Sequence, residues 1–331
     1  QRGASFTGGG TTDISKNDDD DYTLDQWILL SNGNDIVDVT QSTEVPTAGA
    51  TNSIALDVET LNNKFGILQI IEGKDCKSII GGTASLSFKM KASAVDKLDS
   101  VKAAIISWSS TVDAVTSDVV SAWGAEGTRP TLATNWTYEN ANDSGTTGNF
   151  TPTTSWATYT LKNVSIDTGS TTNVGVFIWS DVTDTTAGQF LYITDVQLET
   201  GATNNDFERR SYHSQFSECQ RYYQFQKQAA YGTYAAGTTG TTTQAYMHSQ
   251  LMTPMRVDGS NIAIAVSAAS DFYVLHGATA TNCTGITDND RHGTGLVELR
   301  ATVASGLTAN RGCVLRDDGN GYSWIEYDAE L

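Results

Sequence analysis

Basic residues are the clearest shortage in this sequence. The 331 residues contain 20 Lys and Arg against 38 Asp and Glu, which gives a net charge of −18. The average field of such a chain repels polyanions. The densest basic groups are only the pairs Arg209–Arg210 and Lys89/Lys91. We therefore expect no nucleic acid among its partners.

Cysteine is also sparse, and it is scattered. Cys76, Cys219, Cys283 and Cys313 lie far apart and form no C-x-x-C pair, which argues against metal knuckles and thioredoxin-like redox chemistry. We expect buried small side chains rather than a disulfide framework. Long apolar runs are missing too: none approaches the ~20 residues that span a bilayer, and the polar start at Gln1 has no signal-peptide pattern. Membrane insertion is not expected.

Patterns typical of catalysis are missing. His213, His248, His276 and His292 share no short metal-binding spacing, and the sequence contains neither G-x-S-x-G nor H-E-x-x-H. A Ser-His-Asp arrangement stays open, because triads are spatial rather than sequential. We predict that the chain is not an enzyme.

Long runs of Ala, Leu, Glu and Lys are absent, whereas Thr, Ser and Val recur and Gly (30) far outnumbers Pro (4). This composition favours strands and tight turns. In residues 84–92, Leu86, Phe88 and Met90 alternate with a polar set (Ser85, Ser87, Lys89, Lys91), which predicts a strand with one face in the core and one in water. Further strands are predicted over 101–108, 156–161, 173–179, 190–199, 262–266, 272–276, 296–303 and 322–327. Within 190–199 we expect Phe190, Tyr192, Val196 and Leu198 to share a face.

Two stretches have helical spacing. Val115, Val119 and Trp123 lie four apart and predict a turn or two of helix over 113–123. Residues 211–226 predict a short connector helix, and residues 232–243 are too rich in Gly and Thr to pack by themselves.

The expected fold is all-β: a jelly-roll β-sandwich over 1–210, the helical connector over 211–226 and a smaller β domain over 227–331.

Several phrases resemble bacteriophage tail-fibre and virion structural proteins. They are Gln1-Arg-Gly-x-x-Phe6, Tyr22-x-x-Asp25-x-Trp27, Ser87-Phe-Lys-x-Lys-Ala92, Thr154-Ser-Trp156, Val196-Gln-Leu-Glu-x-Gly201, Phe207-Glu-Arg-Arg210 and Cys219-Gln-Arg-Tyr-Tyr223, with Asp328-Ala-Glu-Leu331 at the end. The resemblance covers 1–226 well and 227–331 loosely. It implies a galactose-binding-like jelly roll, shaped like a carbohydrate-binding module, joined to a distal β domain that serves for oligomerisation or as a tip. Fold analogy alone does not settle function.

Aromatic residues in a polar region are the candidate ligand contacts. Sugar recognition uses flat aromatic faces with polar neighbours that fix the hydroxyls. Trp123, Trp136 and Tyr138, with Asn140, therefore form the candidate glycan site, and the alternative is that these aromatics pack down as loop anchors.

The acidic run Asp18–Asp21 suggests a structural calcium ion, with Asp18 and Asp20 as its ligands. Calcium is the one cofactor that we consider. The run lacks the D-x-D-x-D-G spacing, so a solvated loop is the favoured alternative.

The function we expect is that of a phage virion protein, a tail-fibre or receptor-binding component that contacts host-surface glycans. Its partners would be two further copies of itself in a homotrimer, because fibre assembly buries apolar strand faces between chains, together with other virion proteins. The alternatives are a head fibre or capsid decoration protein without a ligand, and a secreted bacterial glycan-binding module.

Overall fold

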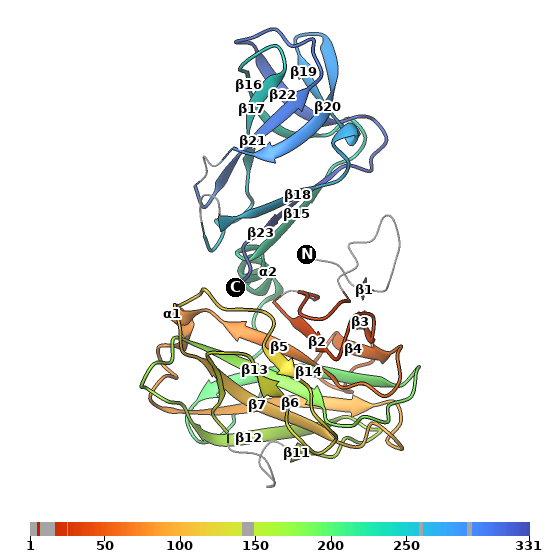
Figure 1. The fold of residues 1–331 in the computed structure, drawn as a ribbon, viewed down its shortest axis with the longest axis vertical. Helices are drawn as coiled ribbons and strands as arrows, with labels where there is room; N and C mark the ends of the chain where they lie inside the picture. The colour runs from red at the N-terminus through yellow and green to blue at the C-terminus, as the bar shows by residue number, and fades with distance from the viewer. Residues whose placement is uncertain (1–4, 7–16, 25, 141–148, 258–260, 290–292) are drawn as a thin grey trace. The chain divides into compact units, whose positions relative to one another are not determined.

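The computed structural model describes residues 5–6, 17–24, 26–140, 149–257, 261–289 and 293–331. Gln1, Asp25 and His292, which were singled out above, lie outside the described residues. The described chain divides into two compact units between Arg209 and Arg210, called here the sandwich unit and the C-terminal unit. The predicted fold class is confirmed, because nearly all regular structure is β (Figure 1).

The first sheet of the sandwich unit has six antiparallel strands. Their order is β1 (Ser5–Phe6), β3 (Val37–Ser42), β4 (Ser53–Val58), β14 (Phe190–Thr200), β6 (Thr83–Ala92) and β12 (Ala157–Ser165). The second sheet runs β10 (Trp136–Tyr138), β7 (Val101–Trp108), β13 (Asn173–Ser180), β5 (Phe65–Ile71) and β2 (Ile28–Ser31), with β11 (Asn149–Phe150) also paired to β7. A helical turn, α1 (Gly73–Cys76), follows β5.

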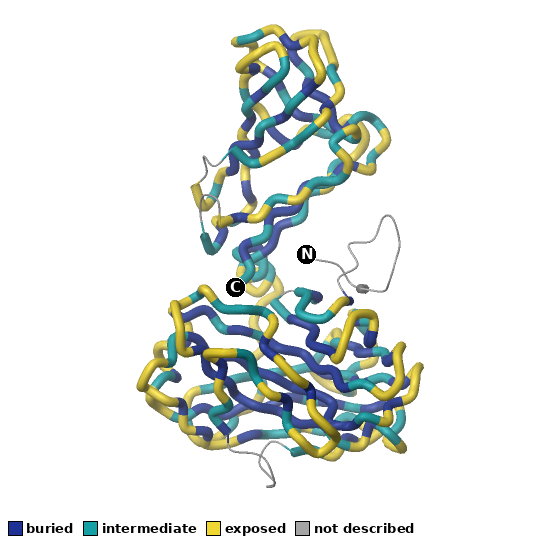
Figure 2. Tube along the Cα trace, viewed as in Figure 1, coloured by how far each residue is buried: buried dark blue, intermediate teal, exposed yellow. Residues whose placement is uncertain are grey.

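The main core lies between the two sheets. It joins Leu56, Leu86 and Phe88 of the first sheet to Ile67 and Ile105 of the second, all fully buried. Figure 2 shows this pattern, with buried residues along the strands of both sheets and exposed residues in the loops. Burial of apolar faces on two facing sheets is what stabilises such a sandwich.

Strand β6 keeps the predicted alternation but not the predicted wet face. Leu86, Phe88 and Met90 are buried as expected, yet Ser85 and Ser87 are buried as well. The Ser85 hydroxyl donates to the carbonyl of Gly201 at 2.8 Å and accepts from the amide of Asn163 at 3.2 Å. The chain around Gly201, just after β14, and Asn163 of β12 thus covers Ser85, and of the four polar residues only Lys89 and Lys91 stay partly exposed.

Strand β14 corrects a second expectation. Its register with β6 shifts between Thr194 and Gln197, where Asp195 has a φ of +50°. Before this bulge Leu191 and Ile193 face the core, whereas after it Val196 and Leu198 do. Phe190 and Tyr192 therefore lie on the outer face, stacked with ring centroids 5.6 Å apart. A bulge adds one residue and so reverses which residues point inward.

The predicted helix over 113–123 is wrong. This segment is irregular and then enters a short hairpin of β8 (Val120–Ala122) and β9 (Thr131–Leu132). Asp113 adopts a left-handed φ of +58°, and its carboxylate accepts hydrogen bonds from the Gly73 amide and the Asn173 side chain, both at 2.7 Å. The spacing of Val115, Val119 and Trp123 does mark a buried face, which is reached by extended chain rather than by a helix.

The C-terminal unit begins with α2 (Tyr212–Gln220), which is shorter than the predicted connector helix. The Ser211 hydroxyl accepts a hydrogen bond from the Ser214 amide and caps the helix. Tyr223 belongs instead to β15 (Tyr223–Lys227), in a three-stranded sheet with β23 (Trp324–Asp328) and β18 (Ala263–Val266).

Six strands of the same unit close into a barrel. Their order is β16 (Thr233–Thr239), β17 (Gln244–Gln250), β21 (Leu296–Val303), β20 (Thr279–Asp288), β19 (Phe272–His276) and β22 (Gly312–Asp317), and a 3₁₀ turn (Ala269–Asp271) precedes β19. Residues 233–239, part of the Gly- and Thr-rich stretch that was not expected to pack by itself, form β16 and pack between β17 and β22. A Cβ on Gly237 would lie 2.0 Å from the carbonyl oxygen of Tyr246, so this glycine lets β16 approach β17.

The four cysteines are free thiols, as expected. Cys76, Cys283 and Cys313 are buried and Cys219 is half-buried. Neither of the helices in the described residues is long and apolar enough to cross a membrane.

Candidate functional site

The outer face of the second sheet carries an aromatic cluster. Residues 109–135 fold back over this face, and their apolar side chains pack against Trp108 of β7 and against Phe177 and Trp179 of β13. Trp123 and Trp136 are only 7% and 6% exposed. Trp123 packs edge-on against Phe177, with centroids 6.1 Å apart. These two indoles are therefore part of a second core, in line with the packing alternative.

Strand β10 brings Trp136 and Tyr138 to the sheet edge. Trp136 pairs with Trp108 and Tyr138 with Ile106 of β7, and a turn with Asn135 at a φ of +72° precedes the strand. Because side chains alternate along a strand, Trp136 and Tyr138 point to the same face. Trp136 packs on Trp108 at 5.3 Å, whereas Tyr138 remains half-exposed.

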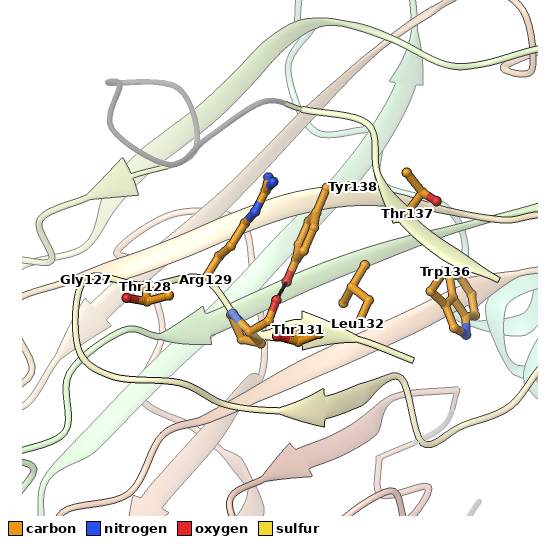
Figure 3. A pocket seen from close by; sticks show the side chains of 9 residues that line it. Gly127, Thr128, Arg129, Thr131, Leu132, Trp136, Thr137 and Tyr138 are labelled. Carbon is orange, nitrogen blue, oxygen red and sulfur yellow. Dashed lines mark hydrogen bonds between the residues drawn. The ribbon is translucent and has the colours of Figure 1, made fainter. Parts of the chain in front are cut away.

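A groove of ≈ 630 Å³ lies between β9 and β10. It is lined by Gly127, Thr128, Arg129, Pro130, Thr131, Leu132, Trp136, Thr137 and Tyr138. In Figure 3 the side chains of Arg129 and Tyr138 run alongside each other, with the guanidinium carbon 4.6 Å from the ring centroid. The Tyr138 hydroxyl donates to the carbonyl of Pro130 at 2.9 Å, which ties the two walls together.

The loop that leads into the groove is held by a buried charge network. Lys64 donates to the carbonyls of Ala125 (2.7 Å) and Thr128 (2.9 Å) and to Asp181 (2.8 Å). Lys102 pairs with the other oxygen of Asp181 at 2.7 Å.

Lys102 also donates to the carbonyl of Gly127 at 3.2 Å. All three charged side chains are buried. Two ammonium groups therefore hold three carbonyls of one short loop, and the wall of the groove is built into the core of the sandwich.

The Asn140 side chain forms hydrogen bonds with the backbone of β7. Its amide donates to the carbonyl of Ala103 and accepts from the amide of Ile105, at 3.2 and 2.9 Å. The side chain thus continues the pairing of β10 with β7 past the end of β10. Of the four predicted ligand residues, the structure places Trp136 and Tyr138 in the groove lining, and Trp123 and Asn140 outside it.

Asp18 and Asp20, the predicted calcium ligands, lie on a turn. Asp18 is exposed, while Asp20 is half-buried with a φ of +62°. Burial and the nearby Asp118 carboxylate raise the pKa of Asp20. Within the described ranges, no group of three or more His, Cys, Asp and Glu side chains is placed to hold a metal ion. A calcium site there stays a prediction.

Sequence reasoning missed Arg129 and the three threonines of the groove, Thr128, Thr131 and Thr137. A signal did exist for Arg129, because it is an isolated cation in an acidic chain and stands before Pro130 in a polar stretch. The threonines gave none, since threonine is common throughout the sequence.

No protein-family model matches the sequence, and no curated protein sequence matches it either. Solved structures do show similarity. The enzymatically active domain of tailspike protein 4 from bacteriophage CBA120 aligns with 53% of this chain, at 15% identity and a TM-score of 0.33. The alignment spans only 19% of that tailspike chain.

Two family 22 carbohydrate-binding modules are also similar. The xylan-binding CBM22-1 domain of Paenibacillus barcinonensis Xyn10C covers 61% of this chain and 94% of its own, at 13% identity and a TM-score of 0.31. The C-terminal family 22 module of Clostridium thermocellum Xyn10B covers 57% and 94%, at 14% identity and a TM-score of 0.33. At these identities and TM-scores the likeness does not tell what this chain binds.

Proposed function

We propose that the sandwich unit binds an oligosaccharide in the groove between β9 and β10. The observation that carries this proposal is the pairing of Arg129 with Tyr138 beside three threonine hydroxyls. An aromatic ring packs against the apolar face of a pyranose, while hydroxyl and guanidinium groups hydrogen-bond to its hydroxyls. The buried network of Lys64, Lys102 and Asp181 favours binding, because a wall that is already ordered loses little entropy when a ligand arrives.

We further propose that the chain acts as a non-enzymatic adhesion component of a phage virion and assembles as a homotrimer. The order of phage-like motifs along residues 1–226 supports this, as does the joining of a β-sandwich to a second, separate β unit. The groove lining supports binding rather than catalysis, since it offers threonine, arginine and aromatic groups, which hold sugars without exchanging protons near neutral pH.

A glycan array probed with the full chain tests the groove. We expect a specific glycan signal that Tyr138→Ala and Arg129→Ala each reduce at least tenfold, while the far-UV circular dichroism of both variants shows that the chain is still folded. Tyr212→Ala, which removes a 77% exposed tyrosine of the C-terminal unit, is the matched control and should leave the signal unchanged. No glycan signal at all, or a signal indifferent to both groove variants, would refute the proposal.

Antibodies against the chain, used to label phage particles for electron microscopy, test the virion assignment. Labelled tail fibres would support adhesion, whereas labelled heads would favour a decoration protein. Mass measurement of the intact assembly in solution should give three chains, and a monomer would refute the trimer.

A further inference from the structure

Two exposed tyrosines lie on neighbouring turns of the C-terminal unit. Tyr231 is 62% exposed and precedes β16, while Tyr322 is 67% exposed and lies between β22 and β23. The two turns touch, because a Cβ on Gly321 would lie 3.7 Å from the backbone nitrogen of Ala230. Two largely exposed tyrosines are therefore carried by adjoining turns.

The backbone of Tyr231 is strained. Its φ of +63° is in the left-handed region, which is unfavourable for a bulky side chain. Its ring lies over Gly319, where a Cβ would come within 2.5 Å of the ring and where φ is +106°. Glycine at 319 therefore makes room for the Tyr231 ring.

One buried carboxylate holds both turns. Asp317 accepts hydrogen bonds from the amides of Tyr231 (3.2 Å), Gly319 (2.7 Å) and Gly321 (3.1 Å). Its other oxygen accepts from the amide and the hydroxyl of Ser323. The two tyrosines thus stand on a single preformed frame.

Because the Tyr231 side chain is exposed, its strained backbone is not explained by packing of that side chain in the core. Backbone strain of this kind is common at residues that bind ligands. Tyrosine offers a rigid ring with a polar tip and loses little entropy on binding. The carboxylates of Asp317 and Asp318 make this place unfavourable for an anionic ligand.

We propose that the turns carrying Tyr231 and Tyr322 form a second ligand site, which takes a neutral pyranoside. This site is separate from the groove and goes beyond the function proposed for it.

Saturation-transfer NMR on the full chain carrying Tyr138→Ala, which removes sugar binding in the groove, tests this site, with methyl α-glucopyranoside, methyl α-mannopyranoside and methyl β-galactopyranoside as probes. We expect transfer to at least one probe, and at least a fivefold loss of it in both Tyr322→Ala and Tyr231→Asn. Asparagine accepts a left-handed backbone more readily than tyrosine. Tyr231→Asn should therefore keep or raise the melting temperature while it removes binding, which a purely structural tyrosine would not do.

Two controls separate this site from others. Tyr212→Ala removes a still more exposed tyrosine (77%) elsewhere in the C-terminal unit and should leave the transfer unchanged, whereas Tyr138→Ala, present in every sample, removes sugar binding in the groove. Transfer that survives both Tyr322→Ala and Tyr231→Asn, or the absence of transfer to any probe, would overturn the inference.

Discussion

Substitution of Asp181 should lower the free energy of unfolding more than substitution at most other positions of the sandwich unit. Its two oxygens face Lys64 and Lys102 at 2.8 and 2.7 Å, and all three side chains are at most 7% exposed. Asp181→Asn would leave two buried ammonium groups without a counter-charge, which should cost about 3–5 kcal/mol or more of unfolding free energy. Lys64→Met should cost less, about 2–4 kcal/mol, because Lys102 and Asp181 stay paired and only the carbonyls of Ala125 and Thr128 lose a partner.

Urea unfolding of the full chain, followed by tryptophan fluorescence, measures both costs. Six of the seven tryptophans lie in the sandwich unit, so the signal reports mainly on its transition. Lys77→Met, an exposed lysine, is the control and should change the free energy by about 0.5 kcal/mol or less. If Asp181→Asn cost less than Lys64→Met, or if both fell below about 1 kcal/mol, the network would not hold the loop as described.

Three further outcomes follow from buried groups. Burial, with Glu59 and Asp38 nearby, raises the pKa of Asp57 to about 6, and its buried Oδ1 has no hydrogen-bond partner among the described residues. Ionising Asp57 therefore costs stability as the pH rises from about 4 to 6, so Asp57→Asn should raise the urea midpoint at pH 7 but not at pH 4, and equal effects would contradict this. Burial opposes ionisation of Asp317, but hydrogen bonds from Ser323, Gly321, Gly319 and Tyr231 outweigh it and lower its pKa. Its contribution is thus present above pH ~4 and lost as the pH falls through the lowered value. Asp317→Ala should cost the C-terminal unit about 3 kcal/mol at pH 7 by calorimetry, and an unchanged transition would count against the frame. Burial also raises the pKa of the Cys76 and Cys283 thiols to about 12 and that of Cys313 to about 11. Iodoacetamide at pH 8 should therefore label Cys219 first by mass spectrometry, and early labelling of Cys283 would show that the barrel opens.

Most of the secondary structure could be predicted from local patterns in the sequence. The predicted strands over 101–108, 272–276 and 296–303 coincide with β7, β19 and β21, because apolar runs and alternation depend on neighbours in sequence. The bulge at Asp195 could not be predicted, since it depends on the register between β14 and β6. The strand at 233–239 was not predicted for a similar reason. Glycine weakens a strand in isolation, but here it permits the close approach of β17.

The groove could be foreseen only in part. Trp136 and Tyr138 stood out as aromatics in polar surroundings, and both line it. Whether such a ring is exposed depends on how its own segment packs: Trp123 is buried because residues 109–135, to which it belongs, fold back across the second sheet. Lys64 and Asp181 lie 117 residues apart, so no spacing in the sequence could pair them.

Closure of the barrel restricts how copies of this chain could associate by strand addition. Since β16 pairs with both β17 and β22, each of the six barrel strands has two neighbours, and the barrel presents no lateral row of unpaired amides and carbonyls along its described strands. Among the described strands, the open edges are β15 and β18 of the small sheet, β1, β12, β10, β11 and β2 of the two sandwich sheets, and β8 and β9 of the two-stranded hairpin. Any contact that extends a sheet from one copy to the next must therefore use these strands, and the barrel can meet a partner only through its side chains and turns.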